Sequence, residues 1–293
     1  MGKVDLHMHS CFSIDGELTP EQLVQRAKKN GVEWISLTDH NSVRGVTRAR
    51  VEAKKQGILF TSGVELDSWC GDDWVHILGY GIGDNDEKFT DLEYEVLCRE
   101  RVAGKQRLKM VQSQGIVVDE AWIWTHAIEG VATAELIVEA ALQEKRNDTH
   151  PLLQPYRRGG ARSASPLVNF AWDHCEPGTR FYVPVQYNSA EKNIALIHSC
   201  GGAAVFAHPG ISVGRKIAVT KKLFDAEIDG IEVFTSYHDR ETACFYRAQA
   251  EKLGLHMTCG SDFHGKTKPR VEIGCADFDE DMNAFDALAW LKK

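Results

Sequence analysis

The eight cysteines of this chain include no C-x-x-C pair, so the sequence lacks the signature of a zinc ribbon or a thioredoxin-type redox site. It also has no apolar leader segment and no apolar run long enough to cross a bilayer. Lysines and arginines number 34 against 42 acidic residues, and the net charge of -8 disfavours an extended nucleic-acid-binding surface. We therefore expect a cytoplasmic protein with reduced thiols and no membrane contact. The oligomeric state stays open.

Short apolar runs alternate with helical stretches toward both ends of the chain. The runs occupy residues 4–9, 34–38, 58–65, 76–82, 203–207, 230–234 and 256–260. Between the first two, Thr19 and Pro20 favour a helix start, and Asn30 with Gly31 favours a helix end. Repeated strand–helix–strand units predict an α/β fold with parallel strands joined by crossover helices.

This alternation stops between residues 84 and 190. A long amphipathic helix over 86–115, several shorter helices and an arginine-rich loop over 146–165 are predicted there. We interpret residues 1–83 and 191–293 as one barrel domain. In this interpretation residues 84–190 form a helical insertion that caps the barrel.

Histidines and carboxylates gather at the ends of the predicted strands. In a parallel α/β barrel, functional groups collect at the carboxyl ends of the strands. The residues at or just beyond these ends are His7, His9, Asp39, His40, Glu65, His208, Glu232, Asp262 and His264. His76 begins its run instead, so it does not fit this rule. Because imidazole and carboxylate groups bind zinc, manganese and iron, the pattern predicts a metal centre.

The first two histidines illustrate how this prediction gains weight. His7 and His9 alternate along a strand, so their side chains share one face. Alone, such a pair is more often two half-exposed histidines than a metal site. The further histidines and carboxylates at other strand ends favour a shared centre.

The order of these residues resembles that of a known family. The chain reads D-L-H-M-H-S at 5–10, D-G at 15–16, T-D-H at 38–40, G-V-E at 63–65, H-I-L-G-Y at 76–80, A-H-P-G at 207–210 and G-S-D-F-H at 260–264. In this order the motifs resemble the polymerase and histidinol phosphatase (PHP) family, and more closely its stand-alone metal-dependent phosphoesterases. The resemblance implies a distorted (β/α)7 barrel, in agreement with the seven apolar runs.

The resemblance also implies a centre of two or three divalent ions per chain, manganese, zinc or iron, trinuclear when full. The first ion would be held by His7, His9, Glu65 and Asp262. The second would share Glu65 and add His76 and His208. The third would be held by Asp15, His40 and His264. Asp39 would orient a histidine, whereas Glu232 could belong to the site or form an ordinary salt bridge.

Clustered divalent ions favour hydrolysis of a phosphate ester. A water shared by two cations loses a proton near neutral pH, and the same cations neutralise charge on phosphoryl oxygens. The expected nucleophile is this bridging hydroxide, which attacks phosphorus in line with the leaving oxygen. We expect His208, Asp262 and His238 to take part in catalysis. Either His208 or a metal-bound water would give the leaving oxygen its proton.

The candidate substrate-binding residues are Arg157, Arg158, Arg180 and His238. Arginine forks match phosphate oxygens, although a solvated basic loop explains the Arg157–Arg158 segment equally well. Nucleotide-cleaving relatives of the family tend to carry Arg and His after a Val-Thr pair, and Gly-Lys before Tyr-Val-Pro. The matching stretches of this chain read V-A-T-A-E at 131–135 and G-T-R at 178–180. This departure favours a phosphorylated sugar over a nucleotide.

The leading hypothesis is a metal-dependent phosphoesterase that acts on a small phosphorylated metabolite, such as a sugar phosphate or a phosphoribosyl cyclic phosphodiester. The first alternative is a 3',5'-bisphosphate nucleotide phosphatase or a 5'-3' oligoribonuclease. A metal-dependent amidohydrolase and a non-catalytic metal-binding module are further alternatives. The complete ligand set disfavours the module, and the arginine-rich loop favours phosphorus chemistry over C–N cleavage.

Overall fold

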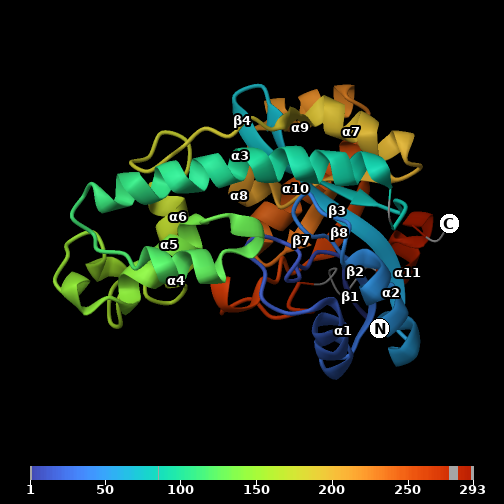
Figure 1. The fold of residues 1–293 in the computed structure, drawn as a ribbon. Helices are drawn as coiled ribbons and strands as arrows, with labels where there is room; N and C mark the ends of the chain where they lie inside the picture. Colours follow the sequence, from blue (N-terminus) through green and yellow to red (C-terminus); the bar gives the residue numbers. More distant parts are fainter. Residues whose placement is uncertain (1, 85, 277–282, 292–293) are drawn as a thin grey trace.

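A single sheet organises the molecule. The computed structural model describes residues 2–84, 86–276 and 283–291. The strands follow the order β1-β2-β3-β4-β6-β7-β8, and a short β5 (Asn188–Ser189) pairs with β3. Figure 1 labels β1–β4, β7 and β8. The strands of the path are β1 (Lys3–Asp5), β2 (Val32–Leu37), β3 (Leu59–Cys70), β4 (Asp73–Tyr80), β6 (Ala203–Phe206), β7 (Gly230–Thr235) and β8 (His256–Gly260). Each corresponds to one of the seven predicted runs.

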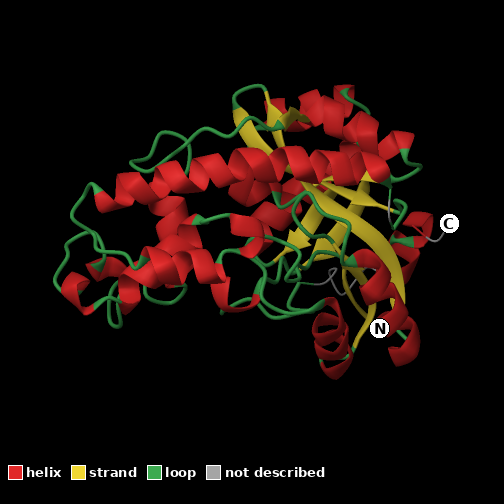
Figure 2. Cartoon of the chain, in the orientation of Figure 1, coloured by secondary structure: helices red, strands yellow, loops and turns green. Residues whose placement is uncertain are grey.

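The two ends of this strand path meet. Just beyond β1, the N–H of Leu6 donates to the carbonyl oxygen of Cys259 at 3.1 Å. Met8 and Phe263 then form a parallel bridge. Figure 2 shows the strands gathered in one half of the molecule, with helices on the outside. The predicted α/β class with a distorted (β/α)7 barrel is thereby confirmed.

Strand β4 runs antiparallel to both of its neighbours, so the expectation of an all-parallel sheet is wrong at this strand. β3 continues to Cys70, and the chain turns at Gly71, whose φ of 66° lies in the left-handed region that glycine tolerates. β4 then returns along β3, and His76 lies opposite Asp67. The beginning of β4 therefore lies at the barrel end where the parallel strands finish. This reversal explains how His76 starts its run and still reaches the site.

Helices cover the outside of the barrel. They are α1 (Pro20–Lys29), α2 (Val46–Gln56), α7 (Ala190–Ser199), α8 (Pro209–Val213), α9 (Ile217–Asp225), α10 (Arg240–Leu253) and α11 (Ala284–Ala287). The predicted start of α1 is confirmed, because Thr19 accepts a hydrogen bond from the N–H of Gln22 and returns one to its side chain. Leu23 and Val24 on the inner face of α1 are buried and hold it against the sheet.

The insertion carries four helices, α3 (Glu87–Gln112), α4 (Glu120–His126), α5 (Ala134–Gln143) and α6 (Pro166–His174). Figure 1 shows α3 running from the barrel across the molecule to α4–α6. Phe89 and Val96 near its start belong to the barrel core, whereas Leu108 packs with Ile137 in a separate apolar cluster. The insertion thus has a core of its own, and α3 takes part in both. The division at residues 84 and 190 stays a prediction.

Short 3₁₀ turns complete the described structure. They lie at Ile128–Gly130, Lys145–Asn147, Gln154–Tyr156, Gly265–Thr267 and Ala289–Leu291. Within the described ranges, no helix combines the length and the apolar character that crossing a membrane requires.

Candidate metal centre

Glu65 lies at the middle of the histidine cluster and is fully buried. Its Oε2 lies 3.1 Å from both His7 Nε2 and His9 Nε2. Its Oε1 lies 2.9 Å from both His76 Nδ1 and His208 Nε2. One carboxylate therefore joins the histidines that follow β1 to those of β4 and β6. This is the arrangement expected of a carboxylate that bridges two ions.

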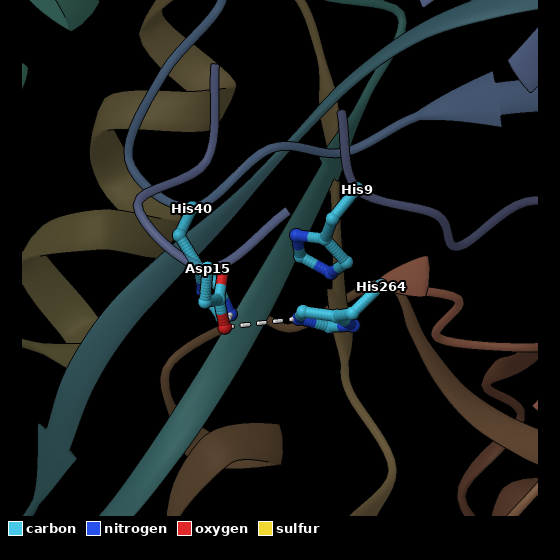
Figure 3. A group of neighbouring side chains, drawn as sticks. All are labelled: His9, Asp15, His40 and His264. Atoms are coloured by element: carbon cyan, nitrogen blue, oxygen red, sulfur yellow. Dashed lines mark ion pairs between the residues drawn. The ribbon is translucent and has the colours of Figure 1, made fainter. Parts of the chain in front are cut away.

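Three groups of donors converge at this end of the barrel. In each group, one ligand atom per residue lies within 4.8 Å of the others. The groups are His7, His9, Glu65 and Asp262; Glu65, His76 and His208; and Asp15, His40 and His264 joined by His9. Figure 3 shows the last group, in which His264 Nε2 lies 3.2 Å from Asp15 Oδ2. The structure brings together every residue proposed as a ligand.

The hydrogen bonds fix which nitrogen of two histidines faces the cluster. His7 Nδ1 donates to Glu232 Oε1 at 3.0 Å, so Nε2 is the nitrogen that faces Glu65. His264 Nδ1 donates to the carbonyl oxygen of Asp262 at 2.9 Å. Among the described residues, the buried atoms without a hydrogen-bond partner include Asp15 Oδ1, His40 Nδ1, Asp262 Oδ1 and His264 Nε2. Facing lone pairs that lack donors require a cation, so this donor set fits divalent metal ions.

The pKa values of the clustered histidines and of Glu65 are shifted by burial and by their charged neighbours. Burial alone would lower the pKa of His7, but Glu65 and the neighbouring carboxylates raise it well above its ordinary value. Burial is likewise overcome at His76, whose pKa rises to about 10 beside Glu65. Burial would raise the pKa of Glu65, yet His7 and the other imidazoles hold it well below its ordinary value. Burial dominates at His9 and lowers its pKa to about 4. In the absence of metal ions, the carboxylates therefore favour protonated His7 and His76. Bound ions would replace these protons.

Two of the proposed ligands sit on an unusual backbone. His208 has a φ of 24° and Asp262 a φ of 57°, a region that non-glycine residues rarely adopt. His208 accepts this conformation directly after β6, and its N–H donates to Glu232 Oε2 at 2.8 Å. Strain of this kind persists where the surrounding structure fixes the side chain, and it clusters at functional sites.

Glu232 contacts two of the proposed ligands at once, which favours its belonging to the site over an ordinary salt bridge. It is fully buried in β7 and binds both His7 Nδ1 and the backbone N–H of His208. Such outer partners fix ring orientation and raise the basicity of the ligand nitrogen. Asp39 has another task than the predicted one. It accepts from the N–H and Oγ of Ser10 at 2.5 and 2.7 Å and so fixes the loop after β1, not a histidine.

Asp67 was missed by the sequence reasoning. Its Oδ1 lies 3.1 Å from His76 Nε2, and His40, Asp67 and His76 form a further group of potential ligands. A signal was present, because Asp67 follows Glu65 by two residues on the same strand and shares its face. Asn41 Nδ2 donates to the other oxygen, Oδ2, at 2.5 Å and holds the carboxylate in this position.

A cavity of about 570 Å³ adjoins the donor cluster. Asp15, His40, His76, His208 and Asp262 reach it from the barrel. The other walls include Trp69 and Trp74 from the β3–β4 pair, Glu100, Arg107, Glu135, Trp172 and Glu176 from the insertion, and Tyr237 and Lys268 from the loops after β7 and β8. The insertion therefore covers the metal centre, and its residues face whatever binds there.

The arginines proposed to bind substrate do not line this cavity. Arg157 donates to the carbonyl oxygen of Leu142 at 3.1 Å and pairs with Asp148 at 3.2 Å. Arg180 donates to Gln114 Oε1 at 3.0 Å, and Arg158 is exposed. The alternative interpretation of a solvated basic loop describes Arg158, whereas Arg157 is partly buried and its Nε and Nη2 are buried without a hydrogen-bond partner.

His238 is also engaged elsewhere. Its Nδ1 donates to the carbonyl oxygen of Val233 at 2.7 Å, and its Nε2 accepts from the N–H of Gly210 at 2.9 Å. Both ring nitrogens are thus used by the backbone, and the side chain does not line the cavity. The structure gives a catalytic or substrate-binding role of His238 no support.

The comparisons with known proteins agree with the geometry. The family model of the PHP domain matches residues 5–144. The 3',5'-nucleoside bisphosphate phosphatase of Chromobacterium violaceum is 28% identical over 281 residues, 94% of this chain and 91% of that protein. The 5'-3' exoribonuclease Rnm of Escherichia coli K12 is 28% identical over 275 residues, 92% of this chain and 87% of that protein. The phosphoribosyl 1,2-cyclic phosphate 1,2-diphosphodiesterase of Eggerthella lenta is 27% identical over 269 residues, 89% and 94% of the two chains.

Solved structures share the fold over nearly the full length. An amidohydrolase from Chromobacterium violaceum superposes with a TM-score of 0.81 at 24% identity, covering 99% of this chain and 96% of that one. A protein from Bifidobacterium adolescentis, proposed to be a metal-dependent phosphoesterase, gives 0.78 at 24% identity, covering 98% and 94%. The fold and the cluster of potential metal ligands together define a barrel hydrolase of the metal-dependent kind. Residues 5–144 match the PHP domain, and over most of its length the chain is similar to phosphatases and phosphodiesterases.

Proposed function

We propose that this protein hydrolyses the phosphate ester of a small phosphorylated metabolite, either a sugar phosphate or a phosphoribosyl cyclic phosphodiester. The observation that carries the proposal is the convergence of three donor groups beside one cavity of about 570 Å³. Cavities of this size suit small ligands rather than polymers. The residues of this chain would bind two or three divalent ions there, and the cavity would hold the organic part of the substrate.

The donor groups assign a task to each residue. His7, His9, Glu65 and Asp262 would hold one ion, His76 and His208 with Glu65 a second, and Asp15, His40 and His264 a third. When bound, such ions lower the pKa of water, orient the phosphoryl group and neutralise its charge. Glu232 keeps two of the histidines in the orientation that binding requires.

Hydrolysis also needs a proton for the leaving group. The oxygen of water forms a new bond to phosphorus, the ester P–O bond breaks, and the departing oxygen takes up a proton. His208 lines the cavity, and its Nδ1 lies 3.1 Å from Ser212 Oγ. Burial lowers the pKa of His208, so the imidazole is neutral at rest. Because His208 is neutral and is proposed to hold an ion through Nε2, we assign the proton of the leaving oxygen to water in the cavity, and neither His208 nor His238 supplies it.

The charges of the cavity favour a metabolite with hydroxyl groups. Glu100, Glu135 and Glu176 line the part under the insertion, and Arg107 is the basic residue among them. Carboxylates accept hydrogen bonds from sugar hydroxyls, and burial raises the pKa of Glu176 to about 7, so that it can also donate. A second phosphate or a nucleic-acid backbone would meet like charge at these residues.

A second candidate is a nucleotide phosphatase or a 5'-3' oligoribonuclease. Two relatives that span most of this chain carry these names. The cavity also offers aromatic walls, among them Trp74 and Tyr187, whose rings are parallel with centroids 6.2 Å apart. Aromatic faces of this kind stack on bases as well as on sugars.

Phosphate release by manganese-loaded protein across a substrate panel tests the proposal. The panel contains ribose cyclic phosphate esters, sugar monophosphates, nucleoside bisphosphates and short RNA, with the chelated protein as the control. We expect release from a sugar phosphate, abolished by chelation. Release from nucleotides alone would replace the proposal by the second candidate. Metal binding without release from any substrate would favour a non-catalytic module or an amidohydrolase.

A further inference from the structure

Lys268 is a mostly buried cation beside the metal centre that the family motifs do not include. It lies in the loop after β8, four residues beyond His264, and its side chain lines the cavity with only 13% of its surface exposed. Arg107 is the other lysine or arginine of the lining. Arg107 lies on α3 of the insertion, whereas Lys268 contacts the donor cluster itself. Its position therefore distinguishes it from every other cation that the cavity presents.

The two carboxylate oxygens of Asp262 have different neighbours, and Lys268 contacts one of them. Lys268 Nζ lies 2.6 Å from Asp262 Oδ2, and the hydroxyl of Tyr237 donates to the same oxygen at 2.5 Å. Asp262 Oδ1 points the other way, 3.0 Å from His9 Nε2, and has no hydrogen bond. One oxygen of Asp262 thus faces the ligand group, while the other holds the ammonium group of Lys268.

The ammonium group keeps unused capacity toward the cavity. An ammonium group has three N–H donors, and Asp262 Oδ2 is its hydrogen-bond acceptor among the described residues. Nζ also lies 5.3 Å from the centroid of the Tyr237 ring, a favourable position for a cation. A nearly buried cation with free donors is costly unless a ligand supplies further acceptors. The oxygens of a phosphoryl group held at the adjoining centre would supply them.

We propose that Lys268 binds a phosphoryl oxygen of the substrate and adds to the centre one positive charge that is independent of the metal ions. This inference rests on the proposed function. Its consequence is a preference among esters, because a phosphate monoester carries one more negative charge than a diester and gains more from a fixed cation. Lys268 would thereby set the relative rates at which this chain cleaves the two classes.

The test compares Lys268→Met and Lys268→Arg with Lys266→Met in the full-length, manganese-loaded protein. Lys266 is a matched control on the same loop, because it is half exposed and its Nζ pairs with Glu139 at 2.7 Å, away from the cavity lining. Three quantities are measured: manganese per chain, the affinity for inorganic phosphate, and kcat/KM for p-nitrophenyl phosphate and for bis-p-nitrophenyl phosphate. Metal content and phosphate affinity are read without turnover.

For Lys268→Met we expect unchanged manganese and about 10-fold weaker phosphate binding, the loss of one charge-assisted contact. The value of kcat/KM should fall about 100-fold for the monoester and about 10-fold for the diester, with partial recovery in Lys268→Arg. Lys266→Met should stay within about 2-fold of the parent.

Two results would overturn the inference. Unchanged phosphate affinity in Lys268→Met would show that the ammonium group does not bind the phosphoryl oxygen. Equal losses for both esters, together with lost manganese, would show that Lys268 acts only by holding Asp262. If the parent protein cleaves neither ester, the phosphate affinities of the variants still decide the role of Lys268, and the substrate panel decides the proposed function separately.

Discussion

Histidines in the barrel and in the insertion use their nitrogens differently. In the barrel, His7 and His9 both aim Nε2 at Glu65 Oε2 from 3.1 Å. In the insertion, His126 Nδ1 donates to the carbonyl oxygen of Trp122 at 2.8 Å. The barrel histidines thus direct a ring nitrogen inward to a shared carboxylate, whereas His126 closes a helix turn. A histidine marks a metal site when other donors point at the same place, and not by its presence alone.

Removing a ligand from the barrel cluster should have the largest effect. We expect Asp262→Ala and His9→Ala each to lower bound manganese and to reduce phosphate ester hydrolysis at least about 1000-fold, because the centre loses a donor that faces the reacting group. Metal analysis, ester hydrolysis and circular dichroism measure the three consequences, with a folded barrel expected throughout.

His126→Ala in the insertion is the matched control for this prediction. It should retain manganese and activity, since the lost hydrogen bond is to an exposed helix carbonyl. Full activity in Asp262→Ala, or equal losses in both regions, would remove the distinction between the two kinds of histidine.

Metal removal should change how stability depends on pH. Without ions, the raised pKa of His76, about 10, stabilises the fold fully below its ordinary value of 6.5 and loses this effect as pH rises. The lowered pKa of Glu65 stabilises the fold above its ordinary value of 4.5, and that contribution is lost in acid. The metal-free protein should therefore be most stable between these two values.

Ions should stabilise the protein most on the alkaline side, because they bind the neutral form of histidine. We expect manganese to raise Tm by about 5–10 °C near pH 8.5 and by less near pH 6, as thermal unfolding with and without chelator would measure. A metal-free protein whose Tm rises from pH 6 to 9 would contradict this account of the cluster.

Glu232 tests whether the barrel cluster depends on the groups that hold it. Glu232→Gln leaves its shape intact but weakens the acceptor for His7 Nδ1, so we expect about 10- to 100-fold weaker manganese binding. Glu241→Gln is a control in an exposed ion pair with Arg215 and should bind manganese as the parent does. Equal affinities in the two variants would return Glu232 to an ordinary salt bridge.

The smallest effects concern the basic residues of the insertion. Arg107 lines the cavity, and its Nε is buried without a hydrogen-bond partner, so Arg107→Met should raise KM for the substrate about 10-fold. Arg158 is exposed outside the cavity lining, and Arg158→Ala should leave KM within about 2-fold. A larger rise for Arg158→Ala would restore the arginine-rich loop as the binding segment.

The barrel could be predicted from the sequence because its geometry follows a general rule. Strands that end together bring their following residues together, so His7 and Asp262 converge although they lie far apart in the chain. His76 did not fit the rule for strand ends, because the apolar pattern of β4 does not indicate the direction in which the strand runs. Asp67 lay on a longer β3 than the pattern indicated, and its alternation with Glu65 was not used.

The insertion follows no such rule. Its helices could be predicted from periodicity, but the way in which they pack decides which side chains face the cavity. Arg157 and Arg158 had the right chemistry, yet the loop turns them toward Asp148 and toward solvent. Arg107 and Glu135 lay within helical stretches and gave no local signal. Lys268 lies four residues beyond a predicted metal-binding motif, and its local sequence likewise gave no sign of its position beside the cavity.

Stepwise return of manganese to the chelated protein, with phosphate release from a sugar monophosphate followed at each step, tests the central claim most directly. The account predicts no release from the chelated protein and activity that rises with occupancy until two or three ions are bound per chain. Release that persists after chelation, or manganese binding that brings no activity with any phosphate ester, would contradict a metal-dependent phosphoesterase centre at this end of the barrel.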